Sequence, residues 1–211
     1  MNDLERALST HWTSTWSDLG LAEPSRSVLD ELLVRYSEAH RAYHTTQHLG
    51  ECFESFASAR EGAEHPGEVG LALWFHDAIY DPRSSDNEAR SADWAERVAT
   101  AAGASGDTLR RVRTLILATR HSARPDGGDA GLTVDIDLSI LGASAERFDE
   151  YEAQVRREYA FVPEAAFGPA RARILEGFVA RERIYTTAFF RERLEARARL
   201  NLRRSIAQLS R

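Results

Sequence analysis

The chain of 211 residues contains no lysine and only one cysteine. Arginine carries all 27 of its positive charges, which we ascribe to codon usage before any demand for bidentate phosphate binding. Cys52 excludes an internal disulfide, and because it shares an apolar helical stripe with Leu49 and Phe53, we predict that it packs in the core. No run of about 18 apolar residues occurs, and residues 1–10 lack the apolar stretch of a signal peptide. We therefore expect a cytoplasmic protein without a membrane partner.

An excess of basic charge is also missing. The formal net charge is -6 and the pI is near 5.7, whereas nucleic-acid binding usually requires a strongly basic face. No nucleic-acid partner is implied. A hydrophobic content of 43% over 211 residues suffices for one well-packed core, and neither a repeat nor a linker divides the chain. We predict one domain over residues 1–211, with a motif core at about 35–145 and C-terminal helices at 145–211 that pack on it.

Apolar residues recur at helical spacing along most of the chain. One segment, 69–79, is apolar nearly all round, which is typical of a buried helix. Residues 122–131, rich in Gly, Asp and Pro, predict a flexible loop, and the strand-like alternation over 132–138 is too short and isolated to build a sheet. These patterns predict an all-α, single-domain helical bundle. Its helices are expected at about 4–19, 24–40, 45–61, 69–79, 86–103, 107–120, 145–159, 169–179 and 187–209.

Polar residues with metal-binding potential interrupt these apolar segments. His76 and Asp77 lie inside the predicted buried helix, where a desolvated carboxylate is costly unless it is paired or bound to a metal. If His44 and His48 share one helix, their spacing of four places both side chains on one face, within about 6 Å. Neither element is specific alone, since such histidine pairs arise often by chance and adjacent helical residues point about 100° apart.

The order of three polar stretches is more informative. They are Tyr-His-Thr-Thr-Gln-His at 43–48, Phe-His-Asp-Ala-Ile-Tyr-Asp at 75–81 and Asp-Ile-Asp-Leu at 135–138. This order resembles the HD superfamily of metal-dependent phosphohydrolases, and most closely a bacterial group of predicted HD-type hydrolases, over about residues 35–205. The Tyr-His opening is similar to that of cyclic-nucleotide phosphodiesterases. Thr45 stands where those enzymes have asparagine, which makes a cyclic-nucleotide substrate doubtful.

The resemblance implies a helical HD-type fold and a set of site residues. It makes His44 the proton donor to the leaving group and gives Asp77 a place in both catalysis and metal binding. Asp137 is preferred over Asp135 because the last Asp of the family is commonly followed by a hydrophobic or basic helix. The implied metal ligands are His48, His76, Asp77 and Asp137.

Two imidazoles and two carboxylates suit one divalent ion such as Mn, Fe, Co, Ni or Zn better than Ca, and Mg stays among the options. Four protein ligands leave room for a water molecule that the ion makes acidic. His44, with an ordinary pKa near 6.5, can then protonate the departing alkoxide. We expect a hydrolase that cleaves a phosphate ester or phosphoanhydride of a small phosphorylated substrate, with nucleotides among the candidates.

Further residues are weaker candidates for substrate binding. His121 can bind phosphate, support a ligand or join a second metal, or it can merely end its helix favourably. Asp81, Asn87 and Glu88 follow the His76 element closely enough to contact the same pocket, or they cap the next helix. Several arginines and tyrosines could hold an anionic substrate or could form a solvated face. These are Arg156, Arg157, Tyr159, Arg181, Arg183 and Tyr185.

Other functions remain open at the level of sequence. The chain could be a non-catalytic metal- or nucleotide-binding module, or an iron-dependent oxygenase on the same scaffold. A helical scaffold with incidental His and Asp residues would leave Asp77 buried without compensation. Substrate identity, the number of metal ions and the oligomeric state cannot be predicted from these patterns.

Overall fold

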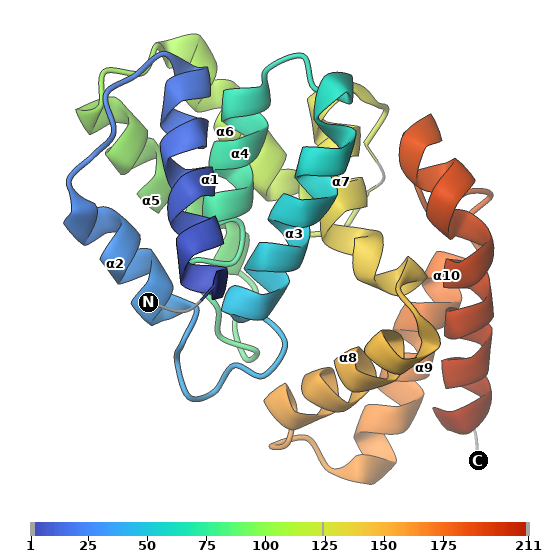
Figure 1. The fold of residues 1–211 in the computed structure, drawn as a ribbon. Coiled ribbons are helices and arrows are strands. Elements are labelled where there is room, and N and C mark those ends of the chain that lie inside the picture. Colours follow the sequence, from blue (N-terminus) through green and yellow to red (C-terminus); the bar gives the residue numbers. More distant parts are fainter. Residues whose placement is uncertain (1–2, 124, 210–211) are drawn as a thin grey trace.

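The structure, a computed structural model, describes residues 3–123 and 125–209 and is all-helical over them (Figure 1). The prediction of an all-α fold is confirmed, while the division into domains stays a prediction. Helices α1 to α6 gather on one side, α8 to α10 lie on the other, and α7 stands between them. The helices are α1 (Asp3–Leu19), α2 (Arg26–Arg35), α3 (Thr46–Ala59), α4 (Pro66–Phe75), α5 (Asn87–Ala101), α6 (Gly106–Ala118), α7 (Gly128–Asp137), α8 (Ala145–Glu158), α9 (Glu164–Val179) and α10 (Ala188–Leu209), with short 3₁₀ turns η1 (Arg60–Gly62) and η2 (Leu138–Gly142).

Helix α4 is the centre of the first group. Helices α1, α3, α5 and α6 all pack against it, and each of its residues from Gly67 to Phe75 is buried. This confirms the helix that its apolar sequence predicts. The ring of Trp12 on α1 packs edge-to-face on that of Trp74, with centroids 5.2 Å apart. Trp12 also packs edge-to-face on Trp16, with centroids 5.4 Å apart. The rigid α4 core therefore supports whatever follows at its C-terminal end.

Helix α1 crosses α4 so closely that only glycine fits at position 67. A Cβ atom there would lie 2.6 Å from the backbone nitrogen of Leu19 and 2.8 Å from the backbone carbon of Asp18. We expect Gly67→Ala to lower the free energy of unfolding by about 1–3 kcal/mol, because the backbone must shift. Urea denaturation measures this. Gly177→Ala, where nothing lies within 4 Å of the added atom, is the control and should not destabilise the fold.

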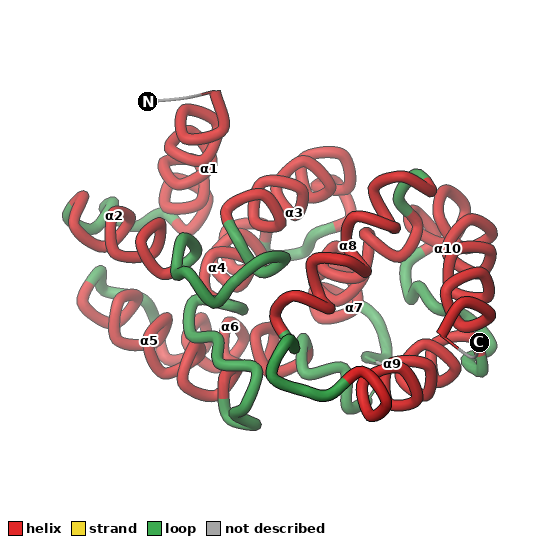
Figure 2. Tube along the Cα trace, turned by 90° about the horizontal axis from the view of Figure 1, so that it is seen from below, coloured by secondary structure: helices red, strands yellow, loops and turns green. Residues whose placement is uncertain are grey.

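The C-terminal helices are tied to the turn that follows α7 (Figure 2). Helix α10 packs on α9 and on η2, and α8 also contacts η2. Asn201 donates to the carbonyl oxygens of Leu141 and Ala143, each at 3.0 Å, and the Tyr185 hydroxyl donates to that of Leu138 at 3.1 Å. Since η2 directly follows Asp137, these bonds fix the C-terminal helices relative to the end of α7.

The structure corrects the predicted helix boundaries near the histidines. Helix α2 ends at Arg35 and not near His40. Helix α3 begins at Thr46, and the Thr45 side chain accepts a hydrogen bond from the backbone N–H of Gln47, so His44 lies before the helix and not on it. The buried helix ends at Phe75 instead of Ile79. His44 and Asp77 consequently belong to loops, whose carbonyl groups are free to bind side chains.

Three further boundaries differ from the prediction. Helix α7 begins at Gly128, inside the predicted loop 122–131, and it includes the alternating segment up to Asp137, with residues Leu132 to Ile136 buried. Helix α9 begins at Glu164, so Pro169 lies inside it instead of starting it. Helix α6 begins at Gly106 instead of 107, and Ser105 caps it, because its hydroxyl accepts a hydrogen bond from the N–H of Thr108.

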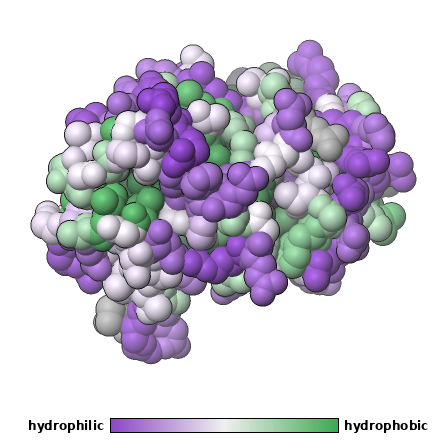
Figure 3. All heavy atoms as spheres, turned by 90° about the horizontal axis from the view of Figure 1, so that it is seen from above, coloured by the Kyte–Doolittle hydropathy of each residue, from purple (hydrophilic) through white to green (hydrophobic). Residues whose placement is uncertain are grey.

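Hydrophilic side chains cover most of the face seen in Figure 3. Val34, Phe161, Ile174 and Leu200 are the large hydrophobic residues that stand exposed among the described residues. No helix in the described part of the chain is both long enough and apolar enough to cross a membrane.

Candidate metal centre

Four side chains from three parts of the chain converge at the end of the α4 core. His48 comes from the first turn of α3, His76 and Asp77 follow α4, and Asp137 ends α7. The Nε2 atoms of His48 and His76 lie 3.2 Å apart. Asp77 Oδ2 is 3.1 Å from His76 Nε2 and 3.6 Å from His48 Nε2. Asp137 Oδ1 is 3.2 Å from His48 Nε2 and 3.6 Å from His76 Nε2.

These separations fit a shared metal ion. Donor atoms held about 2.1 Å from an ion lie roughly 3.0 Å apart at right angles and roughly 3.4 Å apart at tetrahedral angles. His76 Nδ1 donates to the carbonyl oxygen of Leu73 at 2.9 Å, which leaves the lone pair of its neutral ring on Nε2. Because that lone pair and two carboxylate oxygens face the same point, a cation or a proton must lie among them.

Electrostatics within the cluster favours cations over neutral groups. Burial alone lowers the pKa of His76, but the carboxylates of Asp77 and Asp137 outweigh it and raise that pKa well above 6.5. Burial alone raises the pKa of Asp137, but hydrogen bonds from His121, His48 and His76 lower it well below 3.8. Both carboxyl groups therefore stay ionised and bind positive charge, supplied by protons or by a metal.

Cys52 lies beside the same cluster. It is 1% exposed, which confirms its predicted burial, and its Sγ atom is 3.7 Å from His48 Nε2. One donor atom from each of His48, Cys52, His76 and Asp137 can be chosen so that all lie within 4.8 Å of one another, and this group could hold a metal ion. Burial raises the pKa of the Cys52 thiol well above its ordinary value, so the sulfur is a neutral thiol unless a metal ionises it.

The two aspartates at the end of α7 have different surroundings. Asp137 faces the histidines, whereas Asp135 is 0% exposed and faces the start of α10. Asp135 accepts hydrogen bonds from the backbone N–H groups of Thr186 and Thr187, at 2.8 and 2.6 Å, and from the Thr187 hydroxyl at 2.7 Å. The structure thus brings Asp137 into the cluster and uses Asp135 to hold the loop before α10.

Asp135→Asn is expected to destabilise the fold without changing the metal content. An amide can replace one acceptor oxygen but turns an N–H group toward the donors of Thr186 and Thr187, at a cost of about 1–3 kcal/mol. Thermal denaturation and elemental analysis of the same sample check the two halves of this prediction. Loss of metal from a folded Asp135→Asn protein would contradict the separation of roles.

His44 stands next to the cluster and is held by Glu158. Its ring stacks on Tyr80 with centroids 4.1 Å apart, and its Nδ1 donates to Glu158 Oε2 at 2.7 Å. Glu158 Oε2 also accepts from the Tyr80 hydroxyl at 2.8 Å. Glu158 Oε1 accepts from the backbone N–H groups of Ala42, Tyr43 and His44 at 2.8 to 3.0 Å. These five hydrogen bonds to Glu158 fix the orientation of the His44 ring. They use its Nδ1 atom and do not involve its Nε2 atom.

The same contacts set the protonation of this pair. Burial alone lowers the pKa of His44, but Asp77 and the hydrogen bond to Glu158 raise it above 6.5. Burial alone raises the pKa of Glu158, but hydrogen bonds from His44 and from the backbone lower it to about 2. The pair therefore favours a protonated His44 beside an ionised Glu158 more strongly than the free side chains would.

Arg41 anchors the loop that carries His44. Its side chain is fully buried, and it donates to the carbonyl oxygens of His44 at 3.1 Å, Asp77 at 2.7 Å and Ala78 at 3.2 Å. It thereby satisfies the carbonyl groups of both non-helical segments. This explains why the chain leaves the helical conformation on either side of the cluster.

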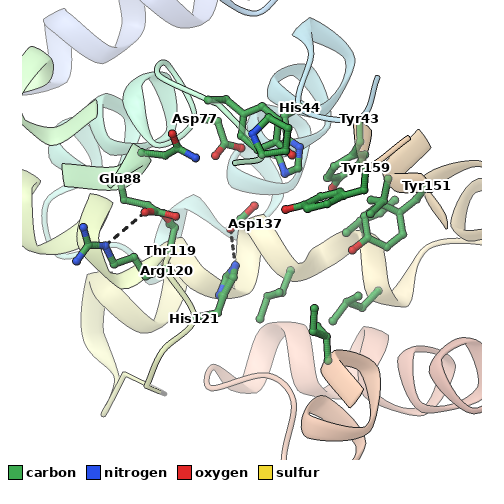
Figure 4. Close-up of a pocket in the computed structure, with 18 of the residues that line it drawn as sticks. Tyr43, His44, Asp77, Glu88, Thr119, Arg120, His121, Asp137, Tyr151 and Tyr159 are labelled. Carbon is green, nitrogen blue, oxygen red and sulfur yellow. Dashed lines mark hydrogen bonds and ion pairs between the residues drawn. The ribbon is translucent and has the colours of Figure 1, made fainter. Parts of the chain in front are cut away.

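A cavity of about 560 Å³ opens on the cluster, and Asp77 and Asp137 lie on its wall (Figure 4). His121 reaches Asp137 Oδ2 through its Nε2 atom, at 2.9 Å, from a backbone with φ of 54°, a left-handed conformation that is costly for a side chain other than glycine. Glu88, which also lines the cavity, accepts from Arg120 Nε at 3.3 Å. The cavity wall thus combines carboxylates with other charged groups and with apolar ones.

The weaker candidates are divided by the structure. Asp81, Asn87, Glu88 and His121 all line the cavity. The Asn87 amide is committed, however, since it accepts from the N–H of Asp81 at 3.1 Å and donates to its carbonyl oxygen at 2.9 Å. These bonds shape the loop 81–87 rather than leaving the amide for a substrate.

The prediction that Arg157 binds substrate is not supported. Arg157 is exposed, and the cavity wall does not include it. Tyr151 and Val155, four positions apart, mark the face of α8 that meets the cavity, and Tyr159 follows directly after the helix. Arg157 follows Val155 by two positions, which turns it to the other face. Tyr159 and Arg181 do line the cavity, whereas Arg156 and Arg183 do not.

Sequence reasoning missed Glu158 and Arg41 and gave Cys52 only a packing role. Glu158 follows Tyr151 by seven positions on the inner face of α8, so a charged residue at an apolar position was the available signal. Cys52 follows His48 by four positions, the spacing of neighbours on a helix. No local pattern distinguishes Arg41 from the other arginines.

Comparison of the chain with protein-family models, with curated proteins and with solved structures gives no match.

Proposed function

We propose that this chain is a metal-dependent phosphohydrolase of the HD type, which cleaves a phosphate ester or phosphoanhydride. The observation that carries the proposal is the convergence of two Nε2 atoms and two carboxylate oxygens, 3.1 to 3.6 Å apart, at the wall of an open cavity. A closed structural metal site would not need such an opening.

A divalent ion held by His48, His76, Asp77 and Asp137 would supply charge neutralisation at a phosphoryl oxygen and a water molecule of lowered pKa. The buried histidines hold the site from behind, because they are only 2% and 1% exposed. The two carboxylates face the cavity and balance the charge of the ion. Their low pKa values keep them ionised at neutral pH.

In this proposal His44 is the proton donor. Its Nδ1 is bonded to Glu158, so the other nitrogen, Nε2, is the one left to donate a proton to a leaving oxygen. The Glu158 carboxylate stabilises the charged imidazole and fixes its orientation. Since His44 lies on the cavity wall together with Asp77 and Asp137, it can reach a substrate that contacts both carboxylates.

The test combines metal analysis with an assay. Protein purified without added metal is analysed for Mn, Fe, Co, Ni and Zn, beside His48→Ala and the control His65→Ala. His65 is a suitable control because its Nδ1 atom pairs with Asp129, at 3.1 Å, and not with a residue of the cluster. Wild type and His65→Ala should each hold about one ion per chain, His48→Ala should lose it, and hydrolysis of phosphate esters should follow metal content.

Two results would contradict the proposal. If wild type neither retains nor takes up a metal, the cluster is a proton-bound pair of histidines and carboxylates. If it binds iron and consumes oxygen without hydrolysing any phosphate ester, the chain is an oxygenase.

A further inference from the structure

Arg171, on α9, is a buried guanidinium on the wall of the same cavity. It is 9% exposed, and its neighbours are residues of α8. Its Nη2 atom donates to the Tyr151 hydroxyl at 2.7 Å and to Glu152 Oε1 at 2.5 Å, while its Nε is 3.5 Å from Glu152 Oε2. Glu152 Oε2 also accepts from the Ser205 hydroxyl at 2.8 Å. The guanidinium is therefore held rigidly from one side only.

Donors on the other side of Arg171 are unused. Its Nη1 atom, which carries two N–H groups, has no hydrogen-bond partner among the described residues. The Tyr151 hydroxyl accepts from Arg171, so its own proton is also available. Both residues line the cavity, and Figure 4 shows the Tyr151 ring beside it. An anion in the cavity can accept from these donors in strong charge-assisted bonds.

These donors are linked to the metal cluster through two aromatic rings. The Tyr43 ring contacts that of His48 at 4.6 Å and that of Tyr151 at 4.5 Å, and Arg171 in turn lies 5.2 Å from the centre of the Tyr151 ring. Three successive contacts thus connect Arg171 to His48. Apolar side chains, among them Leu141, Val155 and Ile174, line the same cavity. The cavity wall therefore combines the cluster carboxylates, the Arg171 and Tyr151 donors and apolar side chains.

We propose that Arg171 and Tyr151 form an anion-binding subsite, and that the substrate carries a second anionic group, a phosphate or a carboxylate, besides the phosphoryl group at the metal cluster. This inference rests on the proposed function for the first of the two groups. The second group is recognised by the guanidinium and phenol donors and does not take part in bond cleavage.

The test uses non-hydrolysable probes of known length. Methylphosphonate, α,ω-alkanediphosphonates with two to eight carbons, and ω-phosphonocarboxylates of the same lengths are titrated calorimetrically into metal-loaded wild-type protein. At one chain length the two-headed probe should bind roughly tenfold or more tightly than methylphosphonate, because a second charge-assisted contact forms. The diphosphonate and phosphonocarboxylate series together tell a phosphate from a carboxylate as the second group.

Variants then assign the gain to the subsite. Arg171→Gln should abolish the advantage of the best two-headed probe and leave methylphosphonate binding unchanged. Arg173→Gln, an exposed arginine on the same helix, is the matched control and should behave like wild type. Because Arg171 also holds Glu152, Tyr151→Phe is the second variant. It removes one hydroxyl and should reduce the advantage severalfold even if Arg171→Gln does not fold.

The outcomes separate this inference from the proposed function. Methylphosphonate binding with no length optimum, or an optimum that survives both Arg171→Gln and Tyr151→Phe, overturns the subsite and leaves the phosphohydrolase proposal intact. If no phosphonate binds the metal-loaded protein, the proposed function fails and the subsite inference fails with it.

Discussion

Asp137→Ala is expected to weaken metal binding by at least about a hundredfold, since even changes to residues that merely support ligands cost ten- to a hundredfold. Asp137 uses both oxygens: Oδ1 lies between His48 and His76, at 3.2 and 3.6 Å, and Oδ2 meets His121 at 2.9 Å. Alanine removes a proposed ligand atom and frees the His121 ring at the same time. Elemental analysis and competition with a chromophoric chelator measure the loss.

The result is informative only beside a folded control. Asp135→Asn serves this purpose, because it changes a buried carboxylate two residues away on the same helix and is expected to keep the metal. Asp137→Ala also removes a buried charge from the cluster. Circular dichroism should therefore be used to check that the variant is folded, which we expect. Metal retained at wild-type stoichiometry in Asp137→Ala would move the site to His48, His76 and the remaining donors, Asp77 and Cys52.

The site residues that can be predicted from the sequence are polar residues that interrupt apolar segments. His76 and Asp77 stand out because they follow nine buried residues of α4, where an unpaired carboxylate is too costly. His48 is indicated by its order relative to them. These residues were predicted as ligands, and the structure brings them together, while their binding of a metal awaits the measurements above.

The parts that could not be predicted depend on contacts between distant segments. Glu158 accepts hydrogen bonds from the backbone of Ala42 to His44, which lie 114 to 116 positions earlier in the sequence. No local pattern in either segment predicts this pairing. The proximity of His44 to His48 was predicted from one shared helix. The observed ring separation of 6.0 Å arises differently, because Arg41 and Glu158 hold the loop before Thr45 against the cluster.

The predicted ends of two helices were wrong for a related reason. Periodicity over residues 24–40 and 69–79 continues beyond the true ends of α2 and α4, since the loop residues that follow are buried by tertiary contacts and not by a helical face. Tyr36 and Ala78 are each fully buried although neither lies on a helix. Apolar spacing therefore indicates burial more reliably than it indicates helix.

Glu158→Gln is expected to reduce kcat by about 10²- to 10⁴-fold while leaving metal content unchanged, if the proposed function holds. Glutamine preserves the shape of the side chain and can still accept from the backbone N–H groups. It removes the negative charge opposite His44 Nδ1, however, and can present an N–H group there, which favours the wrong tautomer of the ring. KM should change little, because Glu158 touches His44 and not the substrate.

The pH profile distinguishes this role from a structural one. The carboxylate stabilises the protonated imidazole, so its removal lowers the pKa of His44, and the loss of activity at alkaline pH should begin at a lower pH than in wild type. Glu150→Gln, about half exposed on the same helix, should leave the profile unchanged. A Glu158→Gln protein that is less stable but keeps wild-type kcat and an unshifted profile would show that Glu158 only holds the loop. In that case the proton must come from a group other than the His44 imidazole.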